Sequence, residues 1–344
     1  MKYYAGLDVS QAETYVSIID ESGKIIRERS VCSESEALAR FLQLGEEVYE
    51  RIGLESGQLS IMLSKGLRKA GLPIICVDAR HMAKALSARV NKNDQNDARG
   101  IAQMMRANLY REVAIKSEES CRMKMVLGSR RQLVKLQGQT YGSLRGLLKI
   151  YGIKLGARHS STVFGSKVRD RMKELDEEIK ASIEALLSVG ETTAQGIKKL
   201  DKQLMQEARK CEDCKRLMTI PGVGVITAMT FKTTVDGKVR FKESRSVGAY
   251  LGLTPKQYAS GEINRQGRIS KMGSKECRTM LYQAALSLLY HSKKPSCIQR
   301  FGLKLVKKKG AKKALVAVSR KLAVMMHAML LKKTDFSYEG IAFT

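Results

Sequence analysis

Residues 3–10 read YYAGLDVS, an apolar and aromatic run that carries one acid, Asp8. Such residues favour a β-strand, which would place Asp8 near its end. Two more strand-like runs follow at residues 14–20 and 25–31, with the turn sequence ESGK at 21–24 between them. These three strands are predicted to form a meander.

Helices and strands alternate beyond the meander. Ser33, with Glu36 three residues later, predicts a capping box for a helix that runs to about residue 48. Asn93 is predicted to cap a later helix. The other predicted elements are a strand at 52–55, a helix at 58–70, a strand at 73–77 and a helix at 94–105. The order β-β-β-α-β-α-β-α predicts an α/β domain of the RNase H type over residues 1–112.

Four carboxylates fall at one predicted edge of this domain. Asp8 lies on the first strand, Glu55 closes the fourth, and Asp94 and Asp97 share one face of the last helix. Mg²⁺ prefers hard oxygen ligands, and two such ions stabilise the transition state of phosphodiester cleavage. The four acids are therefore predicted to be catalytic and to bind Mg²⁺, as two ions. Asp78, after the fifth strand, is predicted to cap a helix instead.

The charge of the chain is unevenly distributed. The whole sequence has 62 basic and 34 acidic residues, a net charge of +28. Residues 1–110 hold 15 basic and 14 acidic side chains, so nearly all of the excess lies in residues 111–344. A strongly cationic body suits a polyanion such as DNA or RNA. A ribosomal-type basic protein and a binder of anionic membranes are the alternatives.

Residues 113–215 are predicted to form a long helical coiled coil. No proline lies between Pro73 and Pro221, and helices are expected at residues 118–150 and 167–214, joined by a turn at 152–165. Apolar residues of the second helix recur at steps of three and four or their sums, as in a coiled-coil seam. They are Met172, Leu175, Ile179, Leu186, Thr193, Ile197, Leu200 and Leu204. The coil is expected to extend the molecule or to pair protomers.

Residues 216–344 are predicted to be mainly helical. The sequence IPGVG at residues 220–224 has the pattern of a helix-hairpin-helix turn, in which Gly222 and Gly224 would bring backbone N–H groups to a phosphate. A plain tight turn is the alternative. Helices are expected at 246–251, 274–291 and 311–331, with LGLTPKQYASGE at 251–262 as a loop or short hairpin.

Ser260 stands beside Gly261 in that loop. A serine hydroxyl needs a base or a metal to become a nucleophile, and no histidine lies in the motif, so a hydrolase triad is not supported. From the local sequence alone, an ordinary turn serine is the simpler interpretation. Basic residues around it are expected to contact phosphates, with a solvated cationic loop as the alternative. They are Lys256, Arg265, Arg268, Lys271 and Lys275.

Membrane insertion and disulfide bonding are not indicated. The most apolar stretch, residues 311–331, contains Arg320, Lys321 and His327 and is predicted to be a buried or amphipathic helix. No signal peptide opens the chain, so a cytoplasmic, nucleoid-associated protein is expected. The seven cysteines show no disulfide framework, and the CxxC of Cys211 and Cys214 lacks the second ligand pair of a zinc site.

The ordered set of motifs resembles the IS110 family of insertion-sequence transposases, which are related to the Piv invertases and use a bridge RNA as guide. The resemblance spans residues 3–290. Its motifs are GLDVS, LES, the D-x-x-D-A element, IPGVG, G-L-x-P followed by SG, and GRISKMG. One departure is Asn93, where many relatives have threonine; it leaves the carboxylates intact.

The resemblance implies an RNA-guided DNA recombinase with a RuvC-like domain and a C-terminal transposase domain. Asp8, Glu55, Asp94 and Asp97 match the family's Mg²⁺-binding DEDD set. Ser260 matches the nucleophile that forms a covalent phosphoserine link, although Ser270 and Ser274 lie nearby. Implied partners are double-stranded donor and target DNA, a structured guide RNA and further copies of the chain, from dimer to tetramer, with carboxylates and serine supplied by different protomers.

Two other functions are consistent with the sequence. A Holliday-junction resolvase or metal-dependent nuclease would use the carboxylates with water as nucleophile and would tolerate Ser260→Ala. A non-catalytic nucleic-acid-binding protein would keep its whole activity after Asp94→Asn.

Overall fold

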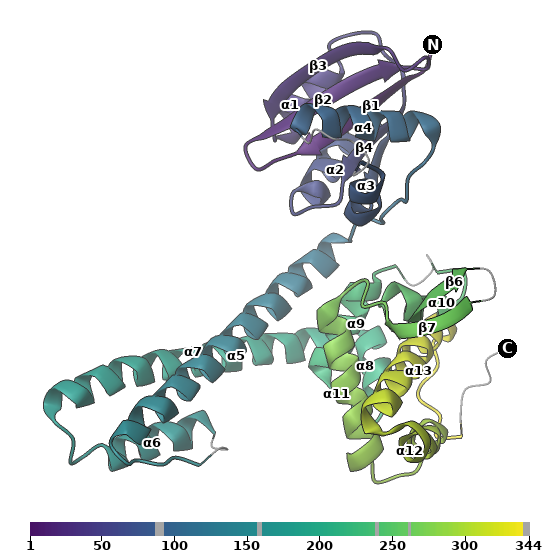
Figure 1. Ribbon diagram of the computed structural model, residues 1–344. Helices are drawn as coiled ribbons and strands as arrows, with labels where there is room; N and C mark the ends of the chain where they lie inside the picture. Colours follow the sequence, from purple (N-terminus) through teal and green to yellow (C-terminus); the bar gives the residue numbers. More distant parts are fainter. Residues whose placement is uncertain (87–92, 157–159, 238–240, 261–262, 340–344) are drawn as a thin grey trace. The chain divides into compact units, whose positions relative to one another are not determined.

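The computed structural model describes residues 1–86, 93–156, 160–237, 241–260 and 263–339 (Figure 1). The chain divides into two compact units, Met1–Lys116 and Ser117–Thr344. Gly261, which follows Ser260 in the predicted loop, lies outside the described residues. The predicted three-part division at residues 112 and 215 stays a prediction.

The first unit is built on a five-stranded sheet in the order β3-β2-β1-β4-β5. Its strands are β1 (Tyr3–Val9), β2 (Glu13–Asp20), β3 (Ile25–Cys32), β4 (Tyr49–Glu55) and β5 (Ile74–Val77). β1, β2 and β3 pair antiparallel, whereas β4 pairs parallel with both β1 and β5. The predicted meander and mixed α/β sheet are confirmed.

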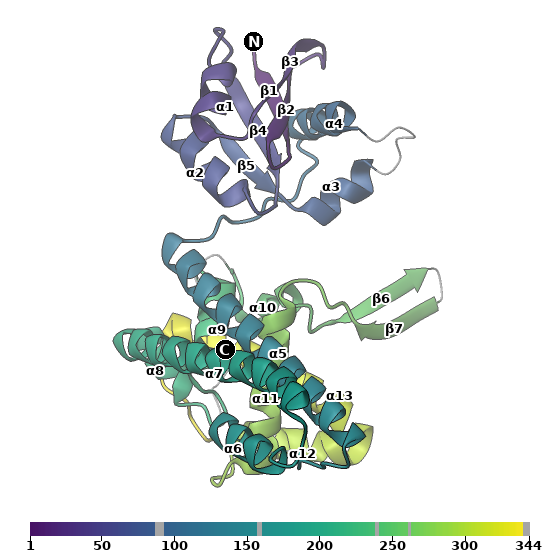
Figure 2. The same cartoon turned by 90° about the vertical axis from the view of Figure 1, so that its left-hand side faces the viewer.

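Helices cover both faces of this sheet. They are α1 (Ser35–Leu42), α2 (Ser60–Lys69), α3 (Ala79–Leu86) and α4 (Asp94–Ala107). Leu7 and Leu54 belong to the core under α1 and α2, while Ile101 and Met105 of α4 belong to a second core on the other face. Figure 2 shows α1 and α2 on one side of the strands and α4 on the other.

The helix caps of this unit give one confirmation and one correction. Asn93 caps α4 as predicted, because its side-chain oxygen accepts a hydrogen bond of 2.7 Å from the N–H of Asn96. The predicted capping box at Ser33 is wrong. The Ser33 hydroxyl donates instead to the Ser10 carbonyl at 2.8 Å and lies 2.8 Å from the Thr14 hydroxyl. The helix begins at Ser35 and ends at Leu42, six residues before the predicted end.

Two long helices of the second unit, α5 (Glu118–Ile150) and α7 (Glu177–Lys210), pack against each other. The helix predicted at 167–214 is interrupted, because α6 (Ser161–Arg171) ends before α7 starts and itself begins inside the predicted turn.

The buried positions of α7 differ from the predicted seam. The buried ones are Ile183, Leu187, Gly190, Thr193, Ala194, Leu204 and Ala208, of which Thr193 and Leu204 belong to the predicted seam. Four other predicted positions, Met172, Leu175, Ile179 and Leu186, are partly buried and pack against the core between the helices. Gly190 is needed beneath the Tyr141 ring of α5, since an added Cβ would lie 2.2 Å from a ring carbon. The coiled-coil assignment itself stays a prediction.

The rest of the second unit is helical apart from one hairpin. Its elements are α8 (Glu212–Met218), α9 (Val225–Val235), α10 (Ser244–Tyr250), β6 (Pro255–Ser260), β7 (Ile263–Ile269), α11 (Lys275–His291), α12 (Cys297–Lys309) and α13 (Ala311–Lys332). The ends of the long helices share its core, through Met123 of α5 and Leu204 of α7. Figure 2 shows β6 and β7 projecting from the helices.

Helix α13 is the centre of that core. Among the described residues it is the one helix long and apolar enough to cross a membrane by composition, with 67% of its most apolar stretch buried. Leu315, Val318 and Leu322 lie in the core of the unit. The prediction of a buried helix here is confirmed.

Candidate active site

Asp8 and Glu55 lie at the same edge of the sheet. β1 and β4 are parallel with Leu7 opposite Leu54, and each acid is the next residue along its strand. Side chains alternate between the two faces of a strand, so both carboxylates project from the face opposite to the one that carries the two leucines. That is the face covered by α4. Both acids are partly exposed.

The first turn of α4 is directed towards this edge. An added Cβ on Gly6 of β1 would lie 2.1 Å from the Ala98 carbonyl oxygen, so only glycine permits this close approach of helix and sheet. Gly53, opposite Gly6 on β4, meets Met105 further along the helix. The helix start therefore lies near the strand end that carries Asp8. Asp97 is partly exposed and Asp94 exposed.

An ion pair on the sheet fixes this part of α4. The Arg99 guanidinium donates from two nitrogens to the Glu28 carboxylate of β3, at 2.7 Å each. Ser17 and Gln95 donate to the same carboxylate at 2.7 and 3.2 Å. The bonds from Arg99 are the main reason that the pKa of Glu28 is lowered. Glu28 and Arg99 thus hold the helix start that carries two of the candidate ligands.

Arg99→Ala is expected to loosen the start of α4 without unfolding the unit. Loss of a charge-assisted bidentate contact costs about 1–2 kcal/mol, which predicts roughly 5- to 30-fold faster amide exchange in the first turns of α4. Because the folded pKa of Glu28 is lowered, its stabilisation is present above pH 4.5, the ordinary value, and is lost as the pH falls through the folded value. Hydrogen exchange of the full chain measures both effects.

A matched control for this experiment is Arg106→Ala, in the last turn of the same helix. Its guanidinium contacts Gln103 at 2.9 Å and the Glu21 carbonyl at 3.2 Å, both exposed. Exchange at the start of α4 should stay unchanged in this variant. Equal acceleration in both variants would show that the Glu28 contact has no special role.

The four acids suit Mg²⁺ by their chemistry, since all offer hard oxygen ligands. No group of three or more His, Cys, Asp or Glu is spaced to hold an ion in the part of the chain that the structure describes. Mg²⁺ is commonly held by one or two carboxylates together with waters and substrate phosphates, so a preformed cage is not required. Asp78 is used differently: it accepts from the N–H groups of Arg80 and His81, as predicted for a cap.

Ser260 is the last residue of β6 and is exposed. Lys256 and Tyr258 share its strand face by alternation, and Arg265 of β7 pairs with Tyr258 in register. A Cβ on Gly267 would lie 3.3 Å from the Tyr258 ring, which places this glycine on the same face. Ser260 thus shares one side of the hairpin with Tyr258, Lys256 and Arg265.

The foot of the hairpin is closely packed and hydrogen-bonded. Gly252 and Gly273, both at positive φ, lie where the segments before and after the hairpin meet. An added Cβ on Gly252 would be 2.1 Å from the Met272 carbonyl, and one on Gly273 would be 2.2 Å from the Tyr250 carbonyl. Arg278 of α11 donates to the carbonyls of Leu251, Met272 and Gly273 at 2.9–3.2 Å. The G-L-x-P motif and the GRISKMG motif therefore meet here, on either side of β6 and β7.

The other basic residues predicted to bind nucleic acid lie on and beside this hairpin. Lys256, Arg265 and Arg268 are exposed on its strands. Lys271 is exposed in the following turn, and Lys275 is the exposed first residue of α11. Their phosphate contacts stay predictions.

The two competing serines are differently placed. Ser274 caps α11, where its hydroxyl oxygen accepts a hydrogen bond of 3.2 Å from the Cys277 N–H. Ser270 is partly buried behind β7, and its backbone N–H donates to the Thr254 carbonyl at 2.8 Å. Neither stands on the strand face of Lys256 and Tyr258 that carries Ser260.

The IPGVG turn joins α8 to α9. Gly222 has a positive φ of 86°, and an added Cβ would lie 2.7 Å from the Ala284 carbonyl, so this glycine allows close packing on α11. Gly224 precedes α9 and meets no atom within 4 Å. A pocket of about 710 Å³ lies beside the turn and includes Lys293 and Lys294. Phosphate binding by the two glycines stays a prediction.

Sequence reasoning missed several residues around these sites. Arg99 and Arg278 give no local motif, because their partners are 71 residues away or are backbone carbonyls. Lys293 and Lys294 stand in a basic run that the sequence pattern does not distinguish from a solvated surface. Only the fold brings them to the IPGVG turn.

Comparisons with known proteins agree with the two regions of motifs. Residues 5–153 match a family model described as a transposase, of the DEDD type of IS110, and residues 214–301 match the transposase IS116/IS110/IS902 family.

Individual relatives extend this agreement. The transposase for insertion sequence element IS1111A of Coxiella burnetii is 28% identical over 335 residues, 96% of this chain and 90% of the relative. A probable family 20 transposase of Pseudomonas aeruginosa is 25% identical over 72% of this chain and 74% of its own length. The pilin gene-inverting protein of Moraxella lacunata is 29% identical over 35% of this chain and 37% of its own length.

Proposed function

Since the chain is a DNA transposase that carries the domains of the IS116/IS110/IS902 family, we propose that it is the RNA-guided recombinase of an insertion sequence, with Ser260 as its nucleophile. The observation that carries this proposal is the exposed Ser260 at the end of β6, on one strand face with Lys256 and beside the strand position that pairs with Arg265. An exposed nucleophile flanked by cations can meet a phosphate of a long polymer that no closed pocket would admit.

The proposed reaction is a transesterification at phosphorus. The Ser260 oxygen attacks, a bond from serine to phosphorus forms, and one phosphorus–oxygen bond of the DNA chain breaks. The serine proton passes to the leaving sugar oxygen, which becomes a free hydroxyl. Attack by a hydroxyl of another strand end reverses these steps and releases the serine, so rejoining needs no external energy source. Lys256 and Arg265 would hold the non-bridging oxygens of the phosphate.

Asp8, Glu55, Asp94 and Asp97 are proposed to hold the metal, which the DEDD domain suggests is a divalent ion. When bound, Mg²⁺ would stabilise the negative charge that develops on the phosphate. The role of this chain's residues is to orient the ligands: Asn93 caps α4, and Arg99 fixes that helix to the sheet. The proposal of two ions rests on the sequence expectation that the four carboxylates serve one site, since two such ions stabilise the transition state of phosphodiester cleavage.

A structured RNA and further copies of the chain are proposed as partners besides donor and target DNA. The charge excess of residues 111–344 supports binding of more than one polyanion. A cytoplasmic, nucleoid-associated location and a dimer or tetramer, with carboxylates and serine from different protomers, belong to the same proposal.

A recombination assay in cells tests the requirement for RNA. Donor and target plasmids carrying the gene with its native flanking DNA should give junction products. A scrambled flank, with the protein expressed equally, should reduce them at least about 100-fold, because base pairing would no longer choose the sites. Unchanged junctions after scrambling would contradict RNA guidance while leaving the transposase activity in place.

A further inference from the structure

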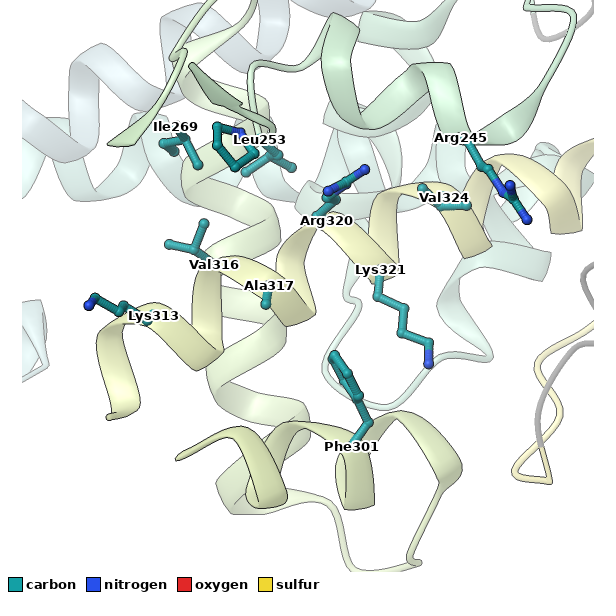
Figure 3. Close-up of a pocket in the computed structure, with 11 residues that line it drawn as sticks. Arg245, Leu253, Ile269, Phe301, Lys313, Val316, Ala317, Arg320, Lys321 and Val324 are labelled. Atoms are coloured by element: carbon teal, nitrogen blue, oxygen red, sulfur yellow. The ribbon is translucent and has the colours of Figure 1, made fainter. Parts of the chain in front are cut away.

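A pocket of about 500 Å³ opens at the foot of the β6–β7 hairpin, beside α12 and α13 (Figure 3). Its apolar lining comes from the hairpin foot and from α13: Leu253, Pro255, Ile269, Val316, Ala317 and Val324. Phe301 of α12 forms the opposite side and is 38% exposed. Figure 3 shows Leu253 and Ile269 on one side of α13 and Phe301 on the other. The pocket therefore combines an accessible aromatic ring with an apolar wall from the hairpin foot and α13.

Cations surround this apolar lining. Arg245 of α10 and three residues of α13, Lys313, Arg320 and Lys321, contribute to it. Among the described residues that line the pocket, none is acidic. The Lys321 ammonium lies 4.5 Å from the centre of the Phe301 ring, a cation–π contact that helps to hold the ring in place. Such a surface attracts an anion that also carries a flat apolar part.

One side of α13 is not used for packing in the core, and its residues form a stripe along the helix. Lys313, Ala317, Arg320 and Val324 follow steps of three and four and so share one side of the helix. The core of the unit uses the other side, through Leu315, Val318 and Leu322. Ala317 and Val324 are partly exposed. The stripe is therefore available to a ligand.

The position of the pocket connects it to the candidate nucleophile. Pro255 and Ile269, which line it, pair with each other at the foot of the hairpin. Ser260 lies five residues further along β6, which at a strand rise of 3.3 Å is about 17 Å. A stacked DNA strand advances about 3.4 Å per nucleotide, so this length corresponds to about five nucleotides. One strand can thus reach both places.

We propose that the pocket takes up one unpaired nucleotide of the DNA strand that the hairpin engages. The base packs between Phe301 and the apolar wall, and Arg320 and Arg245 hold its phosphate. Cations for the backbone and an aromatic surface for a base are the combination that binds single strands, whereas bases inside a duplex are not available for stacking. The volume lies within the range of about 300–1,000 Å³ found for small-ligand sites.

This inference depends on the proposed function only in taking DNA as the ligand, and binding tests it without chemistry. The full chain is titrated, without Mg²⁺ or guide RNA, into a labelled 12-nucleotide single strand, its duplex and the RNA of the same sequence. Phe301→Ala should weaken single-stranded DNA binding roughly 5- to 100-fold and duplex binding less than about twofold. Phe301→Trp keeps an aromatic ring and should bind single-stranded DNA as the parent chain does. Arg320→Ala should weaken binding and lower its salt dependence.

The matched control is Leu303→Ala on the same helix, where the leucine is 40% exposed and outside the pocket. It should bind as the parent chain does. Equal loss for single strand and duplex, or no loss in Phe301→Ala, would overturn the proposal. RNA bound more tightly than DNA would overturn the choice of DNA, and a variant that changes only the oligomeric state would assign the pocket to a second copy. None of these results depends on whether Ser260 is the nucleophile.

Discussion

Ser260→Ala is expected to abolish recombination, with junction products reduced by a factor on the order of 10⁴ or more. The nucleophile cannot be replaced by a neighbouring group in the proposed reaction, and loss of a nucleophilic serine in other enzymes has effects of this size. The side chain is exposed at a strand end, so the variant should fold and bind DNA as the parent does. Junction counting in the plasmid assay, together with DNA affinity of the purified chain, measures both.

The neighbouring serines provide the controls. Ser270→Ala removes a hydroxyl behind β7 and should keep recombination within about threefold of the parent. Ser274→Ala removes the cap of α11 at a cost of about 1 kcal/mol, which lowers stability more than activity. Junctions that survive Ser260→Ala but disappear in Ser270→Ala would move the nucleophile. Junction products that persist in all three serine variants would contradict a serine nucleophile here and favour a nuclease that uses water.

Asp8→Asn is expected to reduce DNA cleavage at least about 100-fold. The metal ion contributes several kcal/mol to the transition state, and each 1.36 kcal/mol is a factor of ten. Glu55→Gln, Asp94→Asn and Asp97→Asn should act in the same direction. Mg²⁺ should raise the thermal midpoint of the parent chain but not of Asp8→Asn, because an ion that binds only the folded state stabilises it.

Asp78→Asn is the matched control in the same unit. Asp78 caps α3 through the N–H groups of Arg80 and His81, and asparagine caps a helix equally well. Cleavage and the response to Mg²⁺ should therefore stay within about twofold of the parent. Loss of cleavage in Asp78→Asn, with full activity in Asp8→Asn, would move the metal site to Asp78 at the end of β5.

The sheet of the first unit could be predicted because its strands carry their own signals. β1, β2 and β5 are rich in β-branched and aromatic residues and are bounded by turn residues, whereas β3 (IIRERSVC) is marked by its turn and its two apolar ends. The order of elements then indicates the topology. The cap predicted at Ser33 was wrong because its hydroxyl bonds instead to the Ser10 carbonyl and lies beside the Thr14 hydroxyl, contacts with residues 23 and 19 positions away in the chain. Helix α12 was missed because its sequence, with three lysines at its end, has the composition of a solvated tail.

The candidate site was predictable only in part. The alignment of Asp8 with Glu55 follows from two parallel strands, but the approach of α4 depends on Gly6 fitting beneath Ala98, a tertiary contact across 92 residues. Ser260 is singled out by the family resemblance, and its role stays a prediction; its place on a strand face with Tyr258 needed the register of β6 and β7. The periodicity of residues 172–204 did not reveal the break before α7, because α6 and α7 each continue an apolar pattern.

Trapping a covalent link between Ser260 and DNA would identify the nucleophile. The full chain is incubated with guide RNA, Mg²⁺ and labelled DNA, denatured, digested and analysed by mass spectrometry. A nucleotide bound through phosphorus to the peptide that contains Ser260, absent from Ser260→Ala, is the predicted result. Cleaved DNA with no protein attached, in parent and variant alike, would contradict a serine nucleophile and identify a nuclease that uses water.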